Sequence, residues 1–437
     1  MSALLGQAMA VCTSGWQLMI KESASLERAL SYCLNKQNPE LRSIVQSLLY
    51  TTVRHRAQVE VLLKKLVQKE PKENIKALLS ISLALLLENK EKDFVVVDQA
   101  VEAAKTLTQT KWAGGFVNAV LRNFLRNRTK LSEGFKTNLC ARFNAPGWWI
   151  SKIRRAYPKN WQNILRVQNS RPPLTLRVNV SKISVEEFLD NLNHAGLHGQ
   201  QVGPLAVIID PPCPVEKIPG FLSGHCSVQD AGSQLVTQFL SLKDHDKVLD
   251  ACAAPGGKTA LLLESQTLNV TAMEVDPARA SKIHETLSRL GLEAKIVVGD
   301  AGDKNVLNQL GMFDAILLDA PCTASGIVRR HPDIVWSRRP EDVKVLASRQ
   351  ARLLEALWEK LPDGKDLLYI VCSIFPEEGP EQIENFLKKH PQAHLKATPL
   401  ASDGMLRLLP TESENNNALP KNHDGFFYAL LNKRSKS

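Results

Sequence analysis

The sequence predicts a multidomain α/β protein, with an all-α domain at residues 1–130, a small α/β domain and a doubly wound, Rossmann-type α/β domain at residues 245–437. Strand-like and helix-like segments alternate after residue 245, which indicates a mostly parallel sheet covered on both faces. Residues 1–130 instead carry apolar residues at spacings of three and four, with almost no strand pattern. The length of 437 residues also exceeds what one hydrophobic core usually supports.

The composition is that of an ordinary protein with reduced thiols. Apolar residues make up 44% and charged residues 23%, which is enough apolar material for extensive cores. The 8 cysteines include no C-x-x-C pair and no cluster with histidines, so we expect neither a metal site nor a disulfide framework. We find no secretory signal and no apolar run of about 18 residues, and therefore expect a cytoplasmic protein without a membrane segment.

Positive charge is concentrated in the helical domain. Residues 1–131 contain 19 Lys and Arg against 11 Asp and Glu, which accounts for +8 of the net charge of +10. Such a distribution favours a polyanionic partner that is held through its phosphates. The last predicted helix, residues 115–128, turns apolar residues inward and presents Arg122, Arg126 and Arg128 as a basic edge, which we expect to contact RNA.

Two segments connect the helical and Rossmann-type domains. Residues 131–172 read as a helical connector that ends at a Pro-Pro break, and its Trp148 and Trp149 are expected to pack inside the protein. Residues 173–244 read as the small α/β domain. It begins with an alternating strand at 174–179, and its helix at 185–195 is preceded by Ser184 at capping-box spacing from Glu187.

The Rossmann-type domain contains five predicted strands, at residues 247–249, 270–275, 294–298, 315–318 and 367–371. Ligands of such sheets bind at the carboxyl ends of the strands. The first four strands each end beside one or more carboxylates. These are Asp250, then Glu274 and Asp276, then Asp300, then Asp319.

A glycine turn follows the first of these strands. The stretch from Asp250 to Thr259 reads as a strand end, a tight turn at Gly256-Gly257 and a helix start, where backbone N–H groups are free to meet a ligand. It lacks the spacing of a triphosphate loop and of a dinucleotide loop. With Asp276 placed for a ribose and Asp300 for an adenine edge, the pattern favours an adenosine-type cofactor without a long phosphate chain.

Two cysteines also lie directly after apolar strands. Cys322 belongs to the loop Asp319-Ala320-Pro321-Cys322, and Cys372 follows the fifth strand. A thiolate is a strong nucleophile, so cysteines at this edge of the sheet predict covalent catalysis on an electrophilic carbon. Spacing alone does not distinguish which thiol is the nucleophile.

Several segments together resemble the S-adenosylmethionine-dependent RNA cytosine-C5 methyltransferases, and among them the bacterial branch that acts on 16S ribosomal RNA. The segments are Asp250–Thr259, Leu318–Gly326, Arg329–Asp333, Cys372–Ser373, Pro376–Glu378, Asn118–Arg122, Arg171–Pro173, Leu176–Asn179 and Asp424–Tyr428. The resemblance spans nearly the whole chain. It implies a NusB-like RNA-binding domain, a linking α/β domain and a Rossmann-type methyltransferase domain, with 16S ribosomal RNA as the partner of a monomeric enzyme.

The resemblance also implies roles for individual residues. Cys372 would be the nucleophile, Asp319 would hold the base edge, and Cys322 would assist proton removal and release. The S-adenosylmethionine site would comprise Cys252, Ala253, Ala254, Pro255, Gly256, Gly257, Lys258, Asp276, Asp300 and Asp319. The RNA contacts that we expect are Arg122, Arg126, Arg177, Arg329 and Arg330.

Alternatives remain at this point. DNA cytosine-C5 methyltransferases use the cysteine of a Pro-Cys loop, which here is Cys322, so only the resemblance favours Cys372. Transfer RNA cytosine-C5 enzymes share the catalytic domain, and a non-catalytic RNA-binding assembly factor of NusB type is a third reading. A methyltransferase acting on an exocyclic amine is disfavoured because its usual Asp/Asn-Pro-Pro-aromatic loop is replaced by Asp319-Ala320-Pro321-Cys322.

Overall fold

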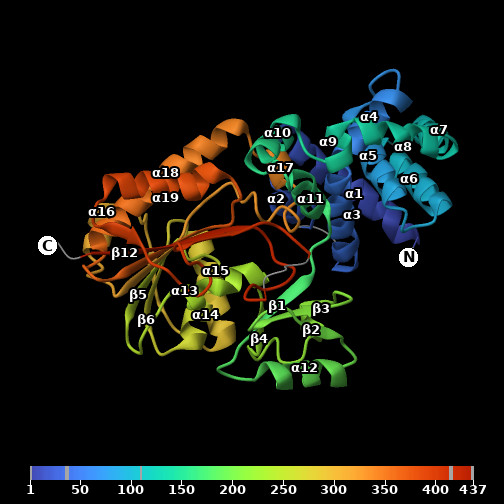
Figure 1. Ribbon diagram of the computed structural model, residues 1–437. Helices are drawn as coiled ribbons and strands as arrows, with labels where there is room; N and C mark the ends of the chain where they lie inside the picture. The colour runs from blue at the N-terminus through green and yellow to red at the C-terminus, as the bar shows by residue number, and fades with distance from the viewer. Residues whose placement is uncertain (1, 35–38, 109–110, 413–416, 435–437) are drawn as a thin grey trace. The chain divides into compact units, whose positions relative to one another are not determined.

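The computed structural model describes residues 2–34, 39–108, 111–412 and 417–434, and the chain divides into two compact units (Figure 1). The first unit contains Met1–Asn169 and Arg330–Arg339, and the second contains Ser170–Arg329 and Pro340–Ser437. Among the described helices, none is both long and apolar enough to cross a membrane.

The first unit is all-helical, as the apolar spacing predicts. Its main helices are α1 (Ser2–Glu22), α2 (Leu26–Leu34), α3 (Arg42–Arg54), α4 (Arg56–Leu66), α5 (Glu73–Glu88), α6 (Asp93–Thr108), α7 (Lys111–Arg126), α8 (Arg128–Thr137), α9 (Leu139–Phe143), α10 (Gly147–Ala156) and α11 (Trp161–Asn169). Helix α5 is the centre of the bundle, because it contacts α1, α3, α4, α6 and α7. Its side chains from Ala77 to Leu86 are all buried, which confirms the expectation that this apolar helix lies inside.

The segment Arg330–Arg339, which contains α17 (Ile334–Ser337), belongs to this helical unit although it is far away in sequence. The carboxylate of Asp333 accepts a hydrogen bond of 3.0 Å from the backbone N of Leu26. The guanidinium of Arg56 lies 4.5 Å from the ring centroid of Trp336, which packs against the helical core. In the sequence this segment lies between strands of the Rossmann-type domain. In the structure its Trp336 packs against the core of the helical unit.

The second unit begins with a small antiparallel sheet of four strands in the order β2-β3-β1-β4. Its elements are β1 (Leu174–Val178), α12 (Val185–His194), β2 (Gly199–Gln201), β3 (Ala206–Ile209) and β4 (Cys226–Val228). The hydroxyl of Ser184 accepts a hydrogen bond from the N–H of Glu187, which confirms the predicted cap of α12. Phe188 and Leu192 of α12 pack onto the sheet.

The larger sheet of this unit has eight strands in the order β10-β12-β9-β8-β5-β6-β7, with β11 paired to β12. The strands are β5 (Lys247–Ala251), β6 (Asn269–Glu274), β7 (Lys295–Val298), β8 (Ala315–Asp319), β9 (Asp366–Val371), β10 (Ala393–Leu395), β11 (Met405–Leu408) and β12 (Phe426–Lys433). Strands β5 to β9 are parallel to one another, as predicted, and β12 runs antiparallel to β9.

Helices cover both faces of the larger sheet (Figure 1). The helices of this part are α13 (Val236–Phe239), α14 (Gly257–Ser265), α15 (Pro277–Leu290), α16 (Lys304–Asn308), α18 (Pro340–Lys360) and α19 (Pro380–Lys389). Alternate strand residues point to opposite faces, so Ile316 and Leu318 pack toward α18 while Ala315 and Leu317 pack toward α13 and α14. Because β5 to β9 are parallel, their carboxyl ends meet at one edge of the sheet.

Candidate active site

The loop after β5 forms the first wall of the site at this edge. Cys252 has a φ of 67° and Gly256 a φ of 98°, so the chain turns sharply twice before α14 begins at Gly257. At Gly256 only a residue without a side chain fits easily, because an added Cβ would lie 3.3 Å from the Cα of Ile283 in α15. Burial raises the pKa of Cys252 to about 12, so this thiol is neutral.

Lys258 joins this loop to the end of β8. Its ammonium donates a hydrogen bond of 2.6 Å to Asp319. Burial by itself lowers the pKa of Lys258, but Asp319, and also Cys372, raise it by more, so the group stays protonated. A cation is therefore hydrogen-bonded to the carboxylate at the end of β8 and interacts electrostatically with the thiol after β9.

Two buried carboxylate oxygens at the edge have no hydrogen-bond partner among the described residues. One is Oδ1 of Asp250, whose other oxygen accepts 2.6 Å from the hydroxyl of Thr259; burial raises the pKa of Asp250 to about 7. The other is Oε2 of Glu274, with Nη1 of Arg279 at 3.5 Å. Buried polar atoms are normally paired, so these two indicate acceptors that are available to a polar ligand.

Glu274 is a candidate that the sequence-based site omits. It is the last residue of β6 and only 2% exposed. Asp276, which the sequence favours for a ribose, instead caps α15, with its Oδ1 accepting from the N–H groups of Ala278 and Arg279 at 2.8 and 3.3 Å. The signal available in the sequence was Pro277, because a proline at the first position of a helix marks the preceding Asp276 as its cap, whereas strand alternation gives residues 274 and 276 the same side.

Asp300 lies after β7 and is held in one orientation. It accepts a hydrogen bond of 2.8 Å from the N–H of Gly302, and Nη2 of Arg352 lies 3.1 and 2.8 Å from its two oxygens. Burial alone would raise the pKa of Asp300, but these hydrogen bonds and the charge of Arg352 hold it below its ordinary value. Asp300 is therefore an ionised acceptor at the same edge as Glu274.

The two cysteines expected at the site, Cys322 and Cys372, lie side by side. The Sγ atoms of Cys322 and Cys372 are 3.4 Å apart, in loops that follow the neighbouring strands β8 and β9. Cys322 is 9% exposed, whereas Cys372 is partly exposed. The hydrogen bond to Cys372 is the largest cause, ahead of burial, that raises the pKa of Cys322 well above its ordinary value. Cys322 therefore holds its proton while Cys372 lies beside the ammonium of Lys258.

Glu378 ties the two cysteine loops together. Its carboxylate accepts 2.8 Å from the backbone N of Thr323 and 2.5 Å from the Thr323 hydroxyl, and also 2.5 Å from the hydroxyl of Ser373. Thr323 and Ser373 each directly follow one of the cysteines. Gln350 donates 3.1 Å to the same carboxylate, which is fully buried. The spacing of the thiols thus depends on a side chain that touches neither sulfur.

The five arginines expected to contact RNA lie in different environments. Arg122 and Arg126 are exposed on α7. Arg330 is partly buried and begins the segment that belongs to the helical unit. Arg177 and Arg329, by contrast, are 1% exposed.

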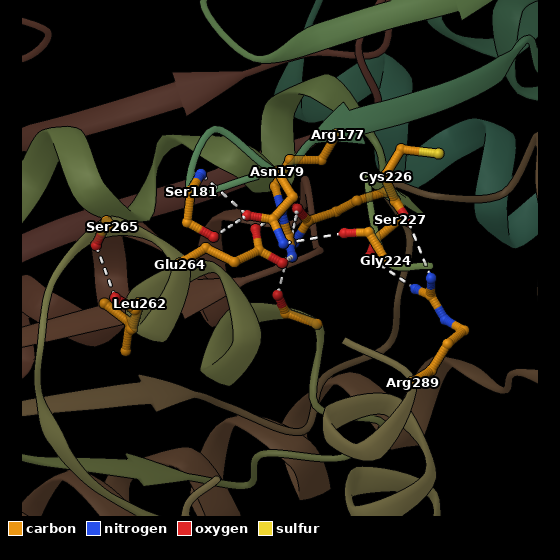
Figure 2. Close-up of polar contacts among 12 residues, drawn as sticks. Arg177, Asn179, Ser181, Gly224, Cys226, Ser227, Leu262, Glu264, Ser265 and Arg289 are labelled. Carbon is orange, nitrogen blue, oxygen red and sulfur yellow. Dashed lines mark hydrogen bonds and ion pairs between the residues drawn. The ribbon is translucent and has the colours of Figure 1, made fainter. Parts of the chain in front are cut away.

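The burial of Arg177 and Arg329 argues against the RNA contacts expected of them. Arg329 forms a buried ion pair with Asp424 and donates 2.8 Å to the Asn422 side chain. Arg177 forms an ion pair with Glu264 inside the second unit, at the centre of Figure 2. Each guanidinium is held by protein acceptors, so neither presents charge to a phosphate.

Arg128, the third member of the predicted basic edge, pairs with Asp93 at 2.7 Å. No group of three or more metal-ligating side chains occurs within residues 2–34, 39–108, 111–412 and 417–434.

Comparison with known proteins identifies all three parts of the chain. The model of a family described as 16S rRNA methyltransferase RsmB/F matches residues 237–432. A model of an RsmF/B-like ferredoxin-like domain matches residues 145–216, and the NusB family matches residues 8–126.

Individual relatives agree with these matches. A protein of Salmonella enteritidis named Ribosomal RNA small subunit methyltransferase B is 36% identical over 96% of this chain and 96% of its own length. The crystal structure of PH0851 matches with a TM-score of 0.75 and 24% identity over 98% of this chain and 99% of its own. NSun6 from Pyrococcus horikoshii, solved with SFG, matches 67% of this chain and 99% of its own with a TM-score of 0.57 and 20% identity.

Proposed function

The chain belongs to the RsmB/F family of 16S rRNA methyltransferases, and we propose that it methylates C5 of a specific cytidine in 16S ribosomal RNA with S-adenosylmethionine as donor. The observation that carries the choice of cytosine C5 is the pair of thiols 3.4 Å apart beside the loop after β5. A thiol at this edge has no evident use in transfer to an exocyclic amine. Carbon C5 of cytosine, however, becomes nucleophilic only after a thiolate has added at C6.

The residues at the edge fit the donor. Oδ1 of Asp250 and Oε2 of Glu274 are buried acceptors without a hydrogen bond, which suits the amino and hydroxyl groups of an aminoacyl nucleoside. The turn at Gly256 admits close approach of a ligand to the backbone, and ionised Asp300 supplies a further acceptor. When bound, S-adenosylmethionine supplies an electrophilic methyl group. We propose Glu274, together with Asp276, for the ribose hydroxyls and Cys252–Lys258 for the remaining contacts.

Cys372 is the proposed nucleophile. It is the more exposed of the two thiols, and it interacts electrostatically with the ammonium of Lys258. A bond from this Sγ to C6 would move the C5–C6 electron pair onto C5 and make that carbon the nucleophile for the donor's methyl group. Asp319 accepts hydrogen bonds from the N4 edge of the base and, with Lys258, stabilises charge that develops on the ring.

Cys322 then acts as the base that removes the C5 proton. Its pKa is raised chiefly by the hydrogen bond to Cys372 and by burial, with the charge of Cys372 as a further cause. Once Cys372 is bonded to C6, that hydrogen bond and that charge are gone, so Cys322 gives up its own proton to water more readily and its thiolate can then take the C5 proton. Transfer of the C5 proton to Cys322 returns the electron pair to the ring and breaks the C6–Sγ bond, which releases Cys372.

The NusB-like part supplies the proposed RNA contact. Arg122 and Arg126 lie on the exposed face of α7, a helix without any acidic residue. Trp112 on the same helix is 69% exposed and stacks on Phe116 with ring centroids 5.7 Å apart. Exposed cations and an exposed aromatic ring on one helix suit phosphates and an unpaired base. We expect the enzyme to act as a cytoplasmic monomer.

Transfer of labelled methyl from S-adenosylmethionine to naked small-subunit RNA tests the proposal, and bisulfite mapping of the product identifies the cytidine. RNA that contains 5-fluorocytidine should trap a covalent complex, because fluorine at C5 cannot leave as a proton. The Cys372→Ala variant should neither methylate nor trap RNA. Trapping by that variant would move the nucleophile to Cys322. Methylation of transfer RNA alone, or none by the wild-type chain, would favour a transfer RNA enzyme or a non-catalytic assembly factor.

A further inference from the structure

A buried polar cluster joins the small sheet to the helices that carry the proposed donor site, as Figure 2 shows. Arg177 comes from β1 of the small sheet, Glu264 from α14 and Arg289 from α15. Helix α14 begins at the glycine turn after β5, and α15 begins at the cap residue Asp276. The cluster therefore connects the small sheet to the start of α14, at Gly257, and to the end of α15, at Arg289.

Arg177 uses its guanidinium on three acceptors. Nε and Nη2 donate to the two oxygens of Glu264 at 2.9 and 2.8 Å, so the pair is bidentate. Nη1 donates 2.5 Å to the side chain of Gln229 and 2.7 Å to the backbone carbonyl of Gly257. The Arg177 side chain is 0% exposed and that of Glu264 is 3% exposed. Four donor contacts from one planar fork leave the group little freedom.

The bond to Gly257 is the part that bears on function. Gly257 is the first residue of α14 and follows Gly256, whose φ of 98° makes the turn. Glu264 lies at the other end of the same helix. Arg177 thus holds α14 at both ends, and the free N–H groups at the start of this helix are those that face a ligand.

Arg289 forms a second bridge in the opposite direction. From the end of α15 it donates 2.6 Å to the carbonyl of Phe221 and 3.1 Å to that of Cys226, and 2.9 Å to the hydroxyl of Ser227. It touches no backbone of the turn after β5 in these contacts. Arg289 therefore fastens the same two domains without holding the proposed donor loop.

We propose that Arg177 is a positioning residue for the methyl donor, through which the small sheet holds the start of α14 in its binding geometry. The inference rests on the proposed use of S-adenosylmethionine and extends it to a domain that does not contain the donor loop. A buried ion pair is weak evidence for stability, because hydrophobic replacements of both partners are often neutral. The hydrogen bond to Gly257 requires the planar guanidinium of Arg177, and a positive charge at this position is not enough.

Matched lysine substitutions at the two bridges separate positioning from domain fastening. Arg177→Lys keeps a cation beside Glu264 but cannot donate to Glu264 and Gly257 in the same geometry. Arg289→Lys makes the same change at the other bridge. We expect Arg177→Lys to raise the dissociation constant for S-adenosylmethionine, measured by calorimetry, about tenfold, the size of one hydrogen bond to a charged group. Arg289→Lys should change it less than about twofold on the same scale.

A second pair of measurements covers effects on folding. The double variant Arg177→Met with Glu264→Met removes both buried charges, and its melting temperature should stay close to that of the wild type while donor binding remains weakened. In the ligand-free protein, hydrogen exchange of the first-turn amides of α14 should quicken in Arg177→Lys and not in Arg289→Lys.

Wild-type donor affinity in Arg177→Lys, or equal weakening in both lysine variants, would overturn the positioning role. A wild-type chain that binds no S-adenosylmethionine would instead reject the proposed function itself, so the two failures are distinguishable.

Discussion

Glu378 gives the sharpest prediction about the active site. It is fully buried and accepts hydrogen bonds from Thr323, Ser373 and Gln350. The change to alanine removes both acceptor oxygens and leaves the donors of the two cysteine loops to find other partners. The expected consequence is a looser spacing of Cys322 and Cys372.

The loss of stability depends on which of these donors can find another acceptor when the carboxylate is removed. The hydroxyls of Thr323 and Ser373 are 3.3 Å apart and can pair with each other, and Gln350 also donates 3.0 Å to the carbonyl of Pro321. The backbone N–H of Thr323, by contrast, loses its hydrogen bond of 2.8 Å to the carboxylate. A hydrogen bond to a charged group contributes about 1.5–3 kcal/mol, so with a weakened bond at Gln350 we expect Glu378→Ala to lower the free energy of unfolding by about 2–4 kcal/mol. Glu378→Gln should cost about 1 kcal/mol, because its carbonyl can serve the N–H while the hydroxyls rotate to accept.

The assay is denaturant unfolding together with single-turnover methylation and trapping on RNA that contains 5-fluorocytidine. Because bond formation needs only Cys372 whereas release also needs Cys322, product release should fall more than trapping in Glu378→Gln. The reasoning is refuted if Glu378→Ala unfolds at the wild-type denaturant concentration, or if trapping and release fall by the same factor in Glu378→Gln.

Three further predictions follow from the site. Cys322→Ala should still form the covalent complex but release product at least about a hundredfold more slowly, as the loss of a general base implies, and gel analysis showing no accumulated complex would contradict it. Burial raises the pKa of Asp250 from 3.8 to about 7, so the folded carboxyl keeps a proton that the unfolded chain releases. Its contribution to the free energy of unfolding should therefore fall as pH rises from about 4 through about 7, and urea unfolding of Asp250→Asn should lack this slope. Arg122→Ala with Arg126→Ala should weaken RNA binding and reduce the salt slope by about 2, whereas Arg329→Met should cost about 3–5 kcal/mol of stability and leave the salt slope unchanged; filter binding over a salt series separates the two.

Local pattern sufficed for the elements that position the site. The five strands expected at residues 247–249, 270–275, 294–298, 315–318 and 367–371 are observed within two residues of those limits. Strand β12 was not expected, because a strand buried on both faces reads as the continuous apolar run Phe426–Leu431 and shows no alternation. The segment Arg330–Arg339 was assigned by its neighbours in sequence, although it belongs to the helical unit.

The sequence by itself determined where the five parallel strands lie along the chain, the turn at Gly256, the carboxylates at the strand ends and the two thiols, because each of these depends on a few adjacent residues. Only the tertiary structure distinguished the arginines. Arg177 and Arg329 look in sequence like Arg122, yet their partners Glu264 and Asp424 lie 87 and 95 residues away, and burial of a charge depends on such partners. The same holds for the 3.4 Å between Cys322 and Cys372, since neighbouring parallel strands bring together loops that are 50 residues apart in the chain.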